Sequence, residues 1–198
     1  MNDTGQPQGG DKQQLRRAVL SRRDALDPRF RYEASWSAAK KAESALHIPK
    51  GAMIAGYWPI RSEIDPRPLL SFMRDKGVRL CLPVVLDKET IAFREFLPDA
   101  ELVQTGFGTM GPDKNAPLVD PAILLMPLAG FDRRGHRLGY GAGHYDRALS
   151  RFRQRGLEPL LIGMAFECQE VPYVPNEPHD IALHQILTET GLRSFDQG

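Results

Sequence analysis

The stretch AILLMPLAGFDRRGHRLGYGAGHYDRALSRFR, residues 122–153, decides the fold class of this chain. It opens with an almost continuous apolar run, passes through a polar turn, and reaches three glycines on alternate positions between 139 and 143. Apolar side chains then recur at helical spacing from Tyr145 to Phe152. The pattern predicts a buried strand, a glycine loop and a helix, which is the repeating unit of α/β proteins.

Similar runs on either side of this stretch predict the rest of the sheet. Short apolar or alternating segments bounded by glycine and proline predict further strands at 52–59, 79–85, 90–96 and 160–166. Helical spacing predicts a helix that begins near Lys12, a second over 30–45, and others over about 66–76 and 143–155. Residues 108–121 are expected to form an irregular loop.

Near-continuous apolar strands are typical of sheets covered on both faces. We therefore expect an α/β fold: a single-domain, doubly wound, mostly parallel sheet with helices on both faces. This domain is expected to span residues 11–198. The Gly-, Gln- and Asn-rich residues 1–10 are expected to form a disordered tail.

Composition excludes several classes of protein. The formal net charge of the 198 residues is +1, so no global field attracts nucleic acid or an anionic membrane. The two cysteines, Cys81 and Cys168, lack CxxC spacing, which argues against a disulfide framework or a thiolate zinc site. No apolar run reaches the ~18 residues that span a bilayer. The expectation is a cytoplasmic monomer with no nucleic-acid or membrane partner.

The glycine loop admits two interpretations on its residues alone. Alternate glycines form flexible turns, but they also let a backbone approach an anion at a helix N-terminus, where N–H groups and the helix dipole favour phosphate. The spacing matches neither a dinucleotide GxGxxG nor a P-loop. Asp146, in the first helical turn, either complements the helix dipole or binds a divalent cation that bridges to phosphate.

Other candidate residues have equally ordinary alternatives. Lys12 and Arg16 share one helical face, either as a solvated basic surface or as ligands for an anion. Glu63 follows a predicted strand beside Trp58, in a region where α/β sheets bind ligands; it is either a solvated loop residue or an acceptor of hydrogen bonds from a heteroaromatic ring. Asp180 either ligates a metal or caps the following segment.

Two further observations limit the chemistry. Asp65 followed by proline is explained as a helix N-cap, and an aromatic at Tyr145 fits the buried face of its helix. The five histidines show no HExxH spacing, and no GxSxG occurs, so neither a zinc centre nor a covalent nucleophile is indicated.

Taken together in their order along the chain, these motifs resemble the 5-formyltetrahydrofolate cyclo-ligase family over about residues 12–190. The resemblance rests on KQQLR (12–16), YWPIRSEID (57–65), LP (82–83), FG (107–108), GFDRRGHRLGYGAGHYDRAL (130–149) and GMAFECQEVPYVPNEPHDIAL (163–183). It implies a doubly wound α/β sheet. It also implies ATP-dependent cyclisation of 5-formyltetrahydrofolate to 5,10-methenyltetrahydrofolate, with release of ADP and phosphate.

The resemblance also implies roles for individual residues. Those expected to bind ATP are Lys12, Arg16, Arg137, Leu138, Gly139, Tyr140, Gly141, Ala142, Gly143, His144 and Tyr145. Those expected to bind the folate are Trp58, Glu63, Phe107, Tyr140, Gly141, Gly143 and His144. Asp146 and Asp180 are expected to bind Mg²⁺, and Arg137, Tyr145 and Asp146 to be catalytic.

This sequence departs from the family pattern at three places. His144 stands where a first tyrosine is usual, Ala142 where glycine or lysine is usual, and GTMGP (108–112) where a glutamate–proline pair is common. Two alternatives to the cyclo-ligase therefore stand beside it: a small-molecule kinase that uses the same phosphate loop, and a folate-binding protein without turnover.

Overall fold

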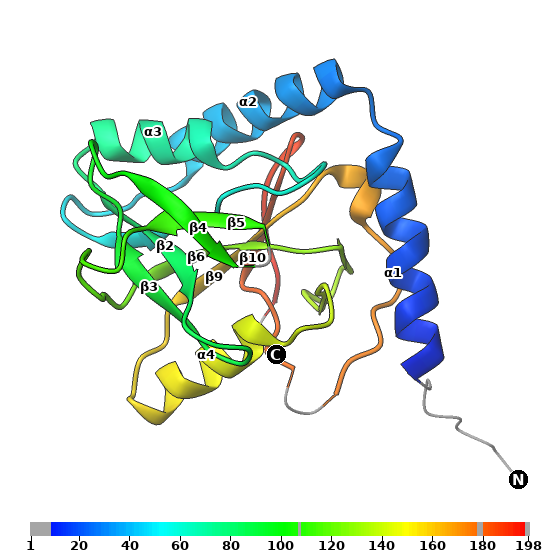
Figure 1. Cartoon of the computed structure of the whole chain (residues 1–198). Helices are drawn as coiled ribbons and strands as arrows, with labels where there is room; N and C mark the ends of the chain where they lie inside the picture. Colours follow the sequence, from blue (N-terminus) through cyan, green and yellow to red (C-terminus); the bar gives the residue numbers. More distant parts are fainter. Residues whose placement is uncertain (1–8, 107, 178–179, 197–198) are drawn as a thin grey trace, which may run out of the picture.

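A seven-stranded sheet forms the centre of the protein (Figure 1). The computed structural model describes residues 9–106, 108–177 and 180–196. The strand order is β11-β10-β9-β6-β1-β2-β3, with the five inner strands parallel and the two edge strands antiparallel to their neighbours. The strands are β1 (Met53–Ala55), β2 (Arg79–Val85), β3 (Ile91–Glu95), β6 (Ile123–Pro127), β9 (Leu160–Met164), β10 (Gln185–Thr188) and β11 (Gly191–Ser194).

Helices cover both faces of this sheet (Figure 1). On one face lie α2 (Pro28–Ala45) and α3 (Arg67–Asp75), and on the other lies α4 (His144–Gln154). The buried side of α2 consists mainly of alanines, so this helix can approach the sheet closely. On α4, Ala148, Leu149 and Phe152 are buried against the opposite face, and each fully buried large side chain stabilises the fold by about 1.5–3 kcal/mol.

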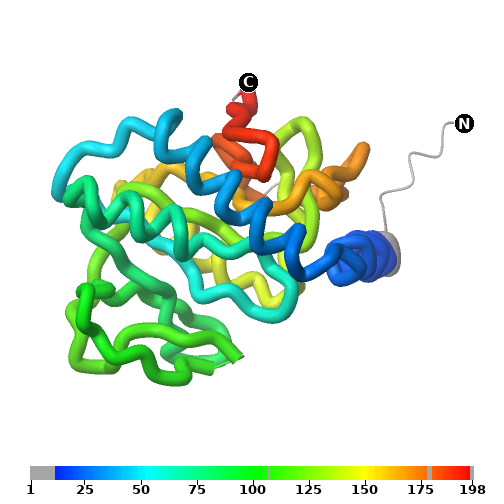
Figure 2. The backbone as a smooth tube through the Cα atoms, turned by 90° about the horizontal axis from the view of Figure 1, so that it is seen from above, coloured from blue at the N-terminus to red at the C-terminus, as the bar shows by residue number. Residues whose placement is uncertain are grey.

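The first helix, α1 (Gly9–Asp24), stands at the edge of the molecule, beside the 3₁₀ turn η1 (Glu167–Gln169). Figure 2 shows α1 nearly end-on, apart from the layers that enclose the sheet. Its Val19 is fully buried in a small cluster with Ala129, Leu138 and Val171. One row of α1 side chains therefore faces the loops that follow β6 and β9.

The direction of winding reverses between β1 and β6. From β1 the chain passes through α3 to β2 on one side, whereas from β6 it passes through α4 to β9 on the other. In doubly wound sheets the crevice outside the carboxyl ends of the strands at such a reversal is the usual ligand site. The fold therefore directs attention to the residues that follow β1 and β6.

Two small antiparallel pairs complete the structure. The hairpin β4 (Leu102–Gly106) and β5 (Thr109–Pro112) lies on the side of the molecule away from α1 (Figure 2). The pair β7 (Gly130–Phe131) and β8 (Arg137–Leu138) encloses a tight turn. Fully buried Asp132 fixes this turn, since its carboxylate accepts hydrogen bonds from the backbone N–H groups of Arg134, His136 and Val174.

The structure confirms the predicted doubly wound α/β class and corrects several details. Residues 108–121 are not all irregular, because they contain β5. The predicted strand over 122–131 is divided into β6 and β7, and β10 with β11 was not anticipated. Helix α1 begins at Gly9, so the last residues of the expected tail are helical. Residues 1–8 lie outside the described part, and the single-domain assignment stays a prediction.

Candidate active site

A cavity of about 520 Å³ opens at the carboxyl ends of β1, β2 and β6, where the winding reverses. Its volume is typical of small-molecule sites. Nearly all the site residues predicted from the sequence line it: Lys12, Arg16, Trp58, Glu63, Arg137, Leu138, Gly139, Tyr140, Gly141, Ala142, Gly143, His144, Tyr145, Asp146 and Asp180. The remaining one, Phe107, lies outside the described residues.

The glycine loop leads directly into the N-terminus of α4. Gly141 and Gly143 have φ values of 99° and 67°, which are conformations that other residues rarely adopt. Gly143 occupies the cap position, and no side chain there accepts a hydrogen bond from the helix. The first turn of α4 therefore directs its dipole toward the cavity, as in helix-terminal anion sites.

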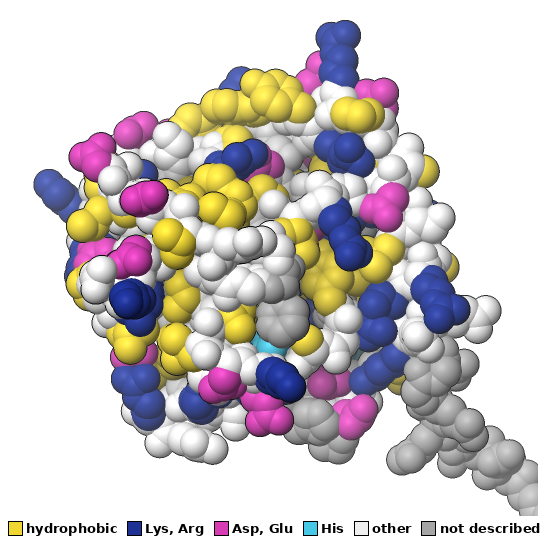
Figure 3. Space-filling model, viewed as in Figure 1, with side chains coloured by type: hydrophobic (Ala, Val, Ile, Leu, Met, Phe, Trp, Pro, Cys, Tyr) yellow, Lys and Arg dark blue, Asp and Glu magenta, His cyan; other side chains and the backbone are white. Residues whose placement is uncertain are grey.

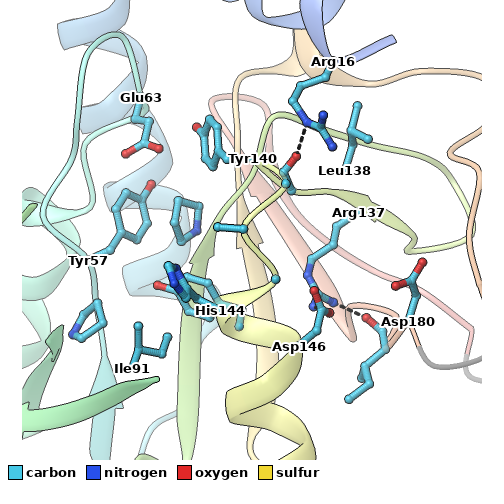
Figure 4. A pocket seen from close by; sticks show the side chains of 18 of the residues that line it. Arg16, Tyr57, Glu63, Ile91, Arg137, Leu138, Tyr140, His144, Asp146 and Asp180 are labelled. Atoms are coloured by element: carbon cyan, nitrogen blue, oxygen red, sulfur yellow. Dashed lines mark hydrogen bonds and ion pairs between the residues drawn. The ribbon is translucent and has the colours of Figure 1, made fainter. Parts of the chain in front are cut away.

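Arg137 occupies the centre of the charged end of the cavity (Figure 4). Its side chain is only 8% exposed and donates hydrogen bonds to the Asp146 carboxylate and to the backbone carbonyl of Ile181. Asp180 interacts electrostatically with the same guanidinium. Burial lowers the pKa of Arg137, and the two carboxylates oppose that shift. One buried cation thus lies between two carboxylates.

Two further cations reach this end of the cavity from α1. The Nε of Arg16 donates to the carbonyl of Gly139 at 2.7 Å. The Nζ of Lys12 lies 3.3 Å from the Glu177 carboxylate and 3.4 Å from that of Asp180. Lysine and arginine side chains gather along the α1 side of the molecule (Figure 3). The three cations expected to bind phosphate, Lys12 and Arg16 of α1 and Arg137 of β8, therefore line the same cavity.

The opposite end of the cavity is built around Glu63. A turn positions it: the backbone N–H of Glu63 donates to Ile60, that of Ile60 donates to the Glu63 carboxylate at 2.9 Å, and Arg61 adopts a φ of 53°. Such a φ is rare for a residue other than glycine. Burial raises the pKa of Glu63, although hydrogen bonds from Tyr140 and Ile60 and the charge of Arg23 oppose the shift. This carboxylate is poised to accept hydrogen bonds from a ligand.

Aromatic and apolar groups surround that carboxylate (Figure 4). The Tyr57 hydroxyl donates to the backbone carbonyl of Ile64 at 2.8 Å, which ties the end of β1 to the segment before α3. The guanidinium of Arg67 lies 5.0 Å from the centre of the Trp58 ring. Pro83, Val85, Ile91, Thr109 and Pro127 complete the wall. This end suits a flat heterocycle with polar edges.

The structure decides several alternatives left open by the sequence. Asp65 is not the N-cap of α3, because Pro66 occupies the cap position and the helix begins at Arg67; the Asp65 carboxylate nevertheless accepts from the backbone N–H of Arg67 at 2.9 Å. Tyr145 packs against the buried cluster beneath α4, which confirms the interpretation that it belongs to the buried face of the helix, and it also lines the cavity. The helix-capping alternative for Asp180 is wrong, because residues 181–184 are not helical; Asp180 accepts instead from the backbone N–H of Glu177.

Some residues of the cavity and its support were missed. Tyr57 follows β1, Pro83 belongs to β2 and Pro127 ends β6, so a prediction of which strands flank the reversal would have found them. Arg23, which is only 2% exposed, donates to Tyr140 behind the cavity wall. It lies seven residues beyond Arg16, on the same side of α1, and this helical spacing was the available signal.

Comparison with known proteins gives one consistent result. The 5-formyltetrahydrofolate cyclo-ligase family matches residues 8–189. The 5-formyltetrahydrofolate cyclo-ligase of Haemophilus influenzae is 32% identical over 182 residues, covering 89% of this chain and 96% of the relative. That of Escherichia coli K12 is 30% identical over 176 residues, covering 86% and 96%.

Two solved structures are similar over most of the fold. The 5,10-methenyltetrahydrofolate synthetase of Aquifex aeolicus matches with a TM-score of 0.76 and 30% identity, covering 94% of each chain. The enzyme of the same name from Mycoplasma pneumoniae matches with a TM-score of 0.72 and 24% identity, covering 90% of this chain and 99% of the other.

Proposed function

The chain belongs to the 5-formyltetrahydrofolate cyclo-ligase family, and from that premise we propose how its cavity performs the reaction. The protein is an ATP-dependent ligase that converts 5-formyltetrahydrofolate to 5,10-methenyltetrahydrofolate, with ADP and phosphate as the other products. The observation that carries the proposal is that one cavity joins a glycine-rich cationic end to an aromatic end with a buried carboxylate.

ATP is assigned to the charged end. The backbone of residues 138–143 and the N-terminus of α4 approach the phosphates, with Lys12, Arg16 and Arg137 supplying positive charge. These cations already have protein partners, such as the Gly139 carbonyl for Arg16. Binding of the triphosphate would therefore exchange internal hydrogen bonds for bonds to phosphate oxygens.

The folate ring is assigned to the aromatic end. Glu63 accepts hydrogen bonds from the N–H groups of the pterin ring, and Trp58 and Tyr140 offer flat surfaces against it. His144 lies between the two ends, at the start of α4, with its Nε2 3.0 Å from the carbonyl of Lys88. With the folate ring at the aromatic end and ATP at the charged end, the formyl group is directed toward the terminal phosphate.

The chemistry requires the formyl oxygen to become a leaving group. That oxygen attacks the γ-phosphorus as the bond to ADP breaks, which gives an iminophosphate at N5. The N10 amine then adds to the activated formyl carbon and loses its proton, and the C–O bond breaks to release phosphate and leave the N5–CH–N10 methenyl bridge. No protein nucleophile is needed, because positioning and neutralisation of the phosphate charge supply the catalysis.

Arg137, Tyr145 and Asp146 are assigned to this step. Arg137 is buried, so its charge acts in a region of low dielectric, where it stabilises the transferring phosphoryl group strongly. Asp146 accepts a hydrogen bond from that guanidinium and holds it in place. The Tyr145 hydroxyl, at the start of α4, has its pKa raised by burial and therefore serves as a neutral hydrogen-bond donor.

The acidic pair also fits Mg²⁺. Among the described residues no three His, Cys, Asp or Glu side chains cluster as a metal site. Mg²⁺, however, usually takes one or two carboxylates together with phosphate oxygens and water. Asp146 and Asp180, which both interact with the same buried cation, meet that requirement. Bound there with ATP, Mg²⁺ would neutralise phosphate charge.

The experiment follows methenyl absorbance when purified protein is incubated with 5-formyltetrahydrofolate and Mg-ATP. We expect product and ADP in equal amounts. A stable phosphorylated folate would indicate a kinase, and folate binding without product would indicate a binding protein; either result overturns the proposal. Withdrawal of Mg²⁺ with a chelator should abolish turnover and leave binding of the folate alone intact.

Location and assembly are part of the same proposal. Within the described ranges no helix is long and apolar enough to cross a membrane, and both cysteines are free. We propose a cytoplasmic enzyme that works as a monomer. Light scattering of the active protein tests the second point.

A further inference from the structure

Arg23 is the largest polar side chain buried in the described part of the protein. It lies in the last turn of α1 and is only 2% exposed. Burying a guanidinium costs several kcal/mol unless it is well paired. The carboxylate of Asp24 lies 3.8 Å from its Nε and is itself largely exposed. Charge pairing with Asp24 alone therefore does not account for the burial.

Two hydrogen bonds direct Arg23 toward the folate end of the cavity. Its Nη1 donates to the Tyr140 hydroxyl at 2.5 Å, and its Nε donates to the Ser62 hydroxyl at 2.9 Å. Ser62 in turn donates to the carboxylate of Asp24. Arg23 thus joins the glycine loop to the turn that precedes Glu63, and it does so from behind, since it does not line the cavity.

These contacts determine how Tyr140 presents its hydrogen. Because the phenol oxygen accepts from Arg23, its own hydrogen is free to donate to another acceptor. The Glu63 carboxylate lies beside this hydroxyl in Figure 4, and the interaction with Tyr140 lowers the pKa of Glu63. The carbonyl of Leu128, at 3.5 Å, is more distant than a good hydrogen bond allows. Arg23 therefore holds the Tyr140 hydroxyl beside the Glu63 carboxylate.

We propose that Arg23 is a positioning residue for the folate: by holding the Tyr140 hydroxyl and the 62–63 turn together, it keeps the Glu63 carboxylate directed at the ring. The proposal rests on the proposed function, because it assigns Glu63 to the folate. Arg23 acts through Tyr140 and Glu63 and has no contact with the reacting atoms.

The other cations of α1 separate this role from ATP binding. Lys12 and Arg16 lie on the same side of the helix as Arg23, but their partners are the 177–180 segment and the Gly139 carbonyl. Only Arg23, among these three, contacts Ser62 and Tyr140. Loss of Arg23 should therefore weaken folate binding much more than ATP binding.

The test compares Arg23→Met with Arg23→Lys and with Arg22→Met, a matched control because Arg22 is the exposed neighbour in the same helical turn. Titration calorimetry with 5-formyltetrahydrofolate, without ATP, gives the affinity. We expect Arg23→Met to weaken it by about tenfold or more, Arg23→Lys to restore part of the loss, and Arg22→Met to match wild type. The KM for ATP should change less than about threefold in all three.

A double-mutant cycle with Tyr140→Phe tests whether Arg23 acts on folate binding through the Tyr140 hydroxyl. If Arg23 acts through the Tyr140 hydroxyl, Arg23→Met should cost much less affinity in the Tyr140→Phe background than alone. Equal losses of folate and ATP affinity in Arg23→Met, or full additivity in the cycle, would overturn the proposal. If Arg23→Met does not fold, Arg23→Lys with the same cycle decides the question by the same criteria.

The pH dependence of folate affinity gives a readout that general loosening of the fold would not produce. The titratable groups that interact with Glu63 are Arg23 of α1, Arg61 of its own turn, Tyr57 after β1, Tyr140 of the glycine loop and Tyr145 of α4. Only ionised Glu63 accepts two ring N–H groups, so affinity should fall as pH falls through its pKa. Arg23 lowers the pKa of Glu63, so in Arg23→Met the loss of folate affinity on acidification should begin at a higher pH than in wild type. An unchanged pH profile of folate affinity would contradict the proposal.

These measurements also separate the two levels of inference. If wild-type protein binds 5-formyltetrahydrofolate but forms no methenyl product, the proposed function fails while the binding cycle still tests Arg23. If wild type turns over normally and Arg23→Met binds the folate as wild type does, the role of Arg23 fails and the proposed function stands.

Discussion

The two ends of the cavity differ in how their polar groups are satisfied. At the charged end, Arg16 and Arg137 are already bonded to a carbonyl and a carboxylate of the protein. At the aromatic end, Glu63 is held by a backbone N–H and a tyrosine and retains acceptor capacity that faces the cavity. The first end must exchange partners when a ligand binds, whereas the second is formed in advance.

This difference has an energetic meaning. A preformed site loses little conformational freedom on binding, so its contacts contribute directly to affinity. A site whose cations are internally paired gains only the difference between the new and the old partners. The charged end is therefore suited to interactions that strengthen during phosphoryl transfer, and the aromatic end to recognition of the ring. Substitutions at the two ends should affect different kinetic constants.

The largest effect is expected from a substitution that disrupts the charged end alone. Asp146→Asn removes a carboxylate assigned to Mg²⁺ and releases Arg137 from its partner, so kcat should fall by about 10²–10³-fold. Affinity for 5-formyltetrahydrofolate without ATP should stay near that of wild type. Steady-state kinetics and calorimetry measure the two quantities. Asp120→Asn, which breaks a similar pair with exposed Arg155, is the control and should leave both unchanged. Near-normal turnover of Asp146→Asn would remove this residue from the site.

The second largest effect is expected from a substitution that disrupts the aromatic end alone. Glu63→Gln keeps the size of the side chain but loses its charge, so the KM for the folate should rise by about 10–100-fold, as for loss of hydrogen bonds to a charged group. The KM for ATP should change little. Glu33→Gln, at an exposed position on α2, is the control. Parallel rises in both KM values would show that the two ends are not separable.

A smaller effect tests the backbone of the glycine loop. Gly141 has a φ of 99°, so Gly141→Ala should cost about 1–3 kcal/mol of strain, or alter the loop and raise the KM for ATP several-fold. Gly139 is not in this conformation, and a Cβ there meets nothing within 4 Å. Gly139→Ala is therefore the matched control and should be milder in both thermal unfolding and kinetics. The reverse order would contradict the assigned role of this loop.

The smallest effect concerns His144, where the ends meet. Its position in the first turn of α4 is compatible with the tyrosine usual in the family, and both side chains donate hydrogen bonds. His144→Tyr should therefore keep kcat/KM for the folate within about threefold of wild type. A loss of more than tenfold would show that the surrounding residues have adapted to the imidazole, and would make this position part of the site's specificity.

Local pattern was sufficient for the elements that are formed by neighbours in the chain. The strand, glycine loop and helix of residues 122–153 follow from periodicity. The order of the motifs predicts that Lys12, Glu63, Asp146 and Asp180 share one site, and all four line the same cavity. The strands β10 and β11 and the β4–β5 hairpin were missed, because short strands are stabilised by partners distant in sequence.

The sequence by itself determined the class of fold, the family, and many of the residues that line the cavity, because spacing and motif order are properties of the chain. Only the tertiary structure decided that Arg137 lies between two carboxylates, and that Arg23 is buried against Tyr140 and Ser62. Charge and burial depend on which distant segments pack together. Lys12, Arg16 and Arg23 lie on the same side of α1, and their spacing alone does not indicate which of them is buried.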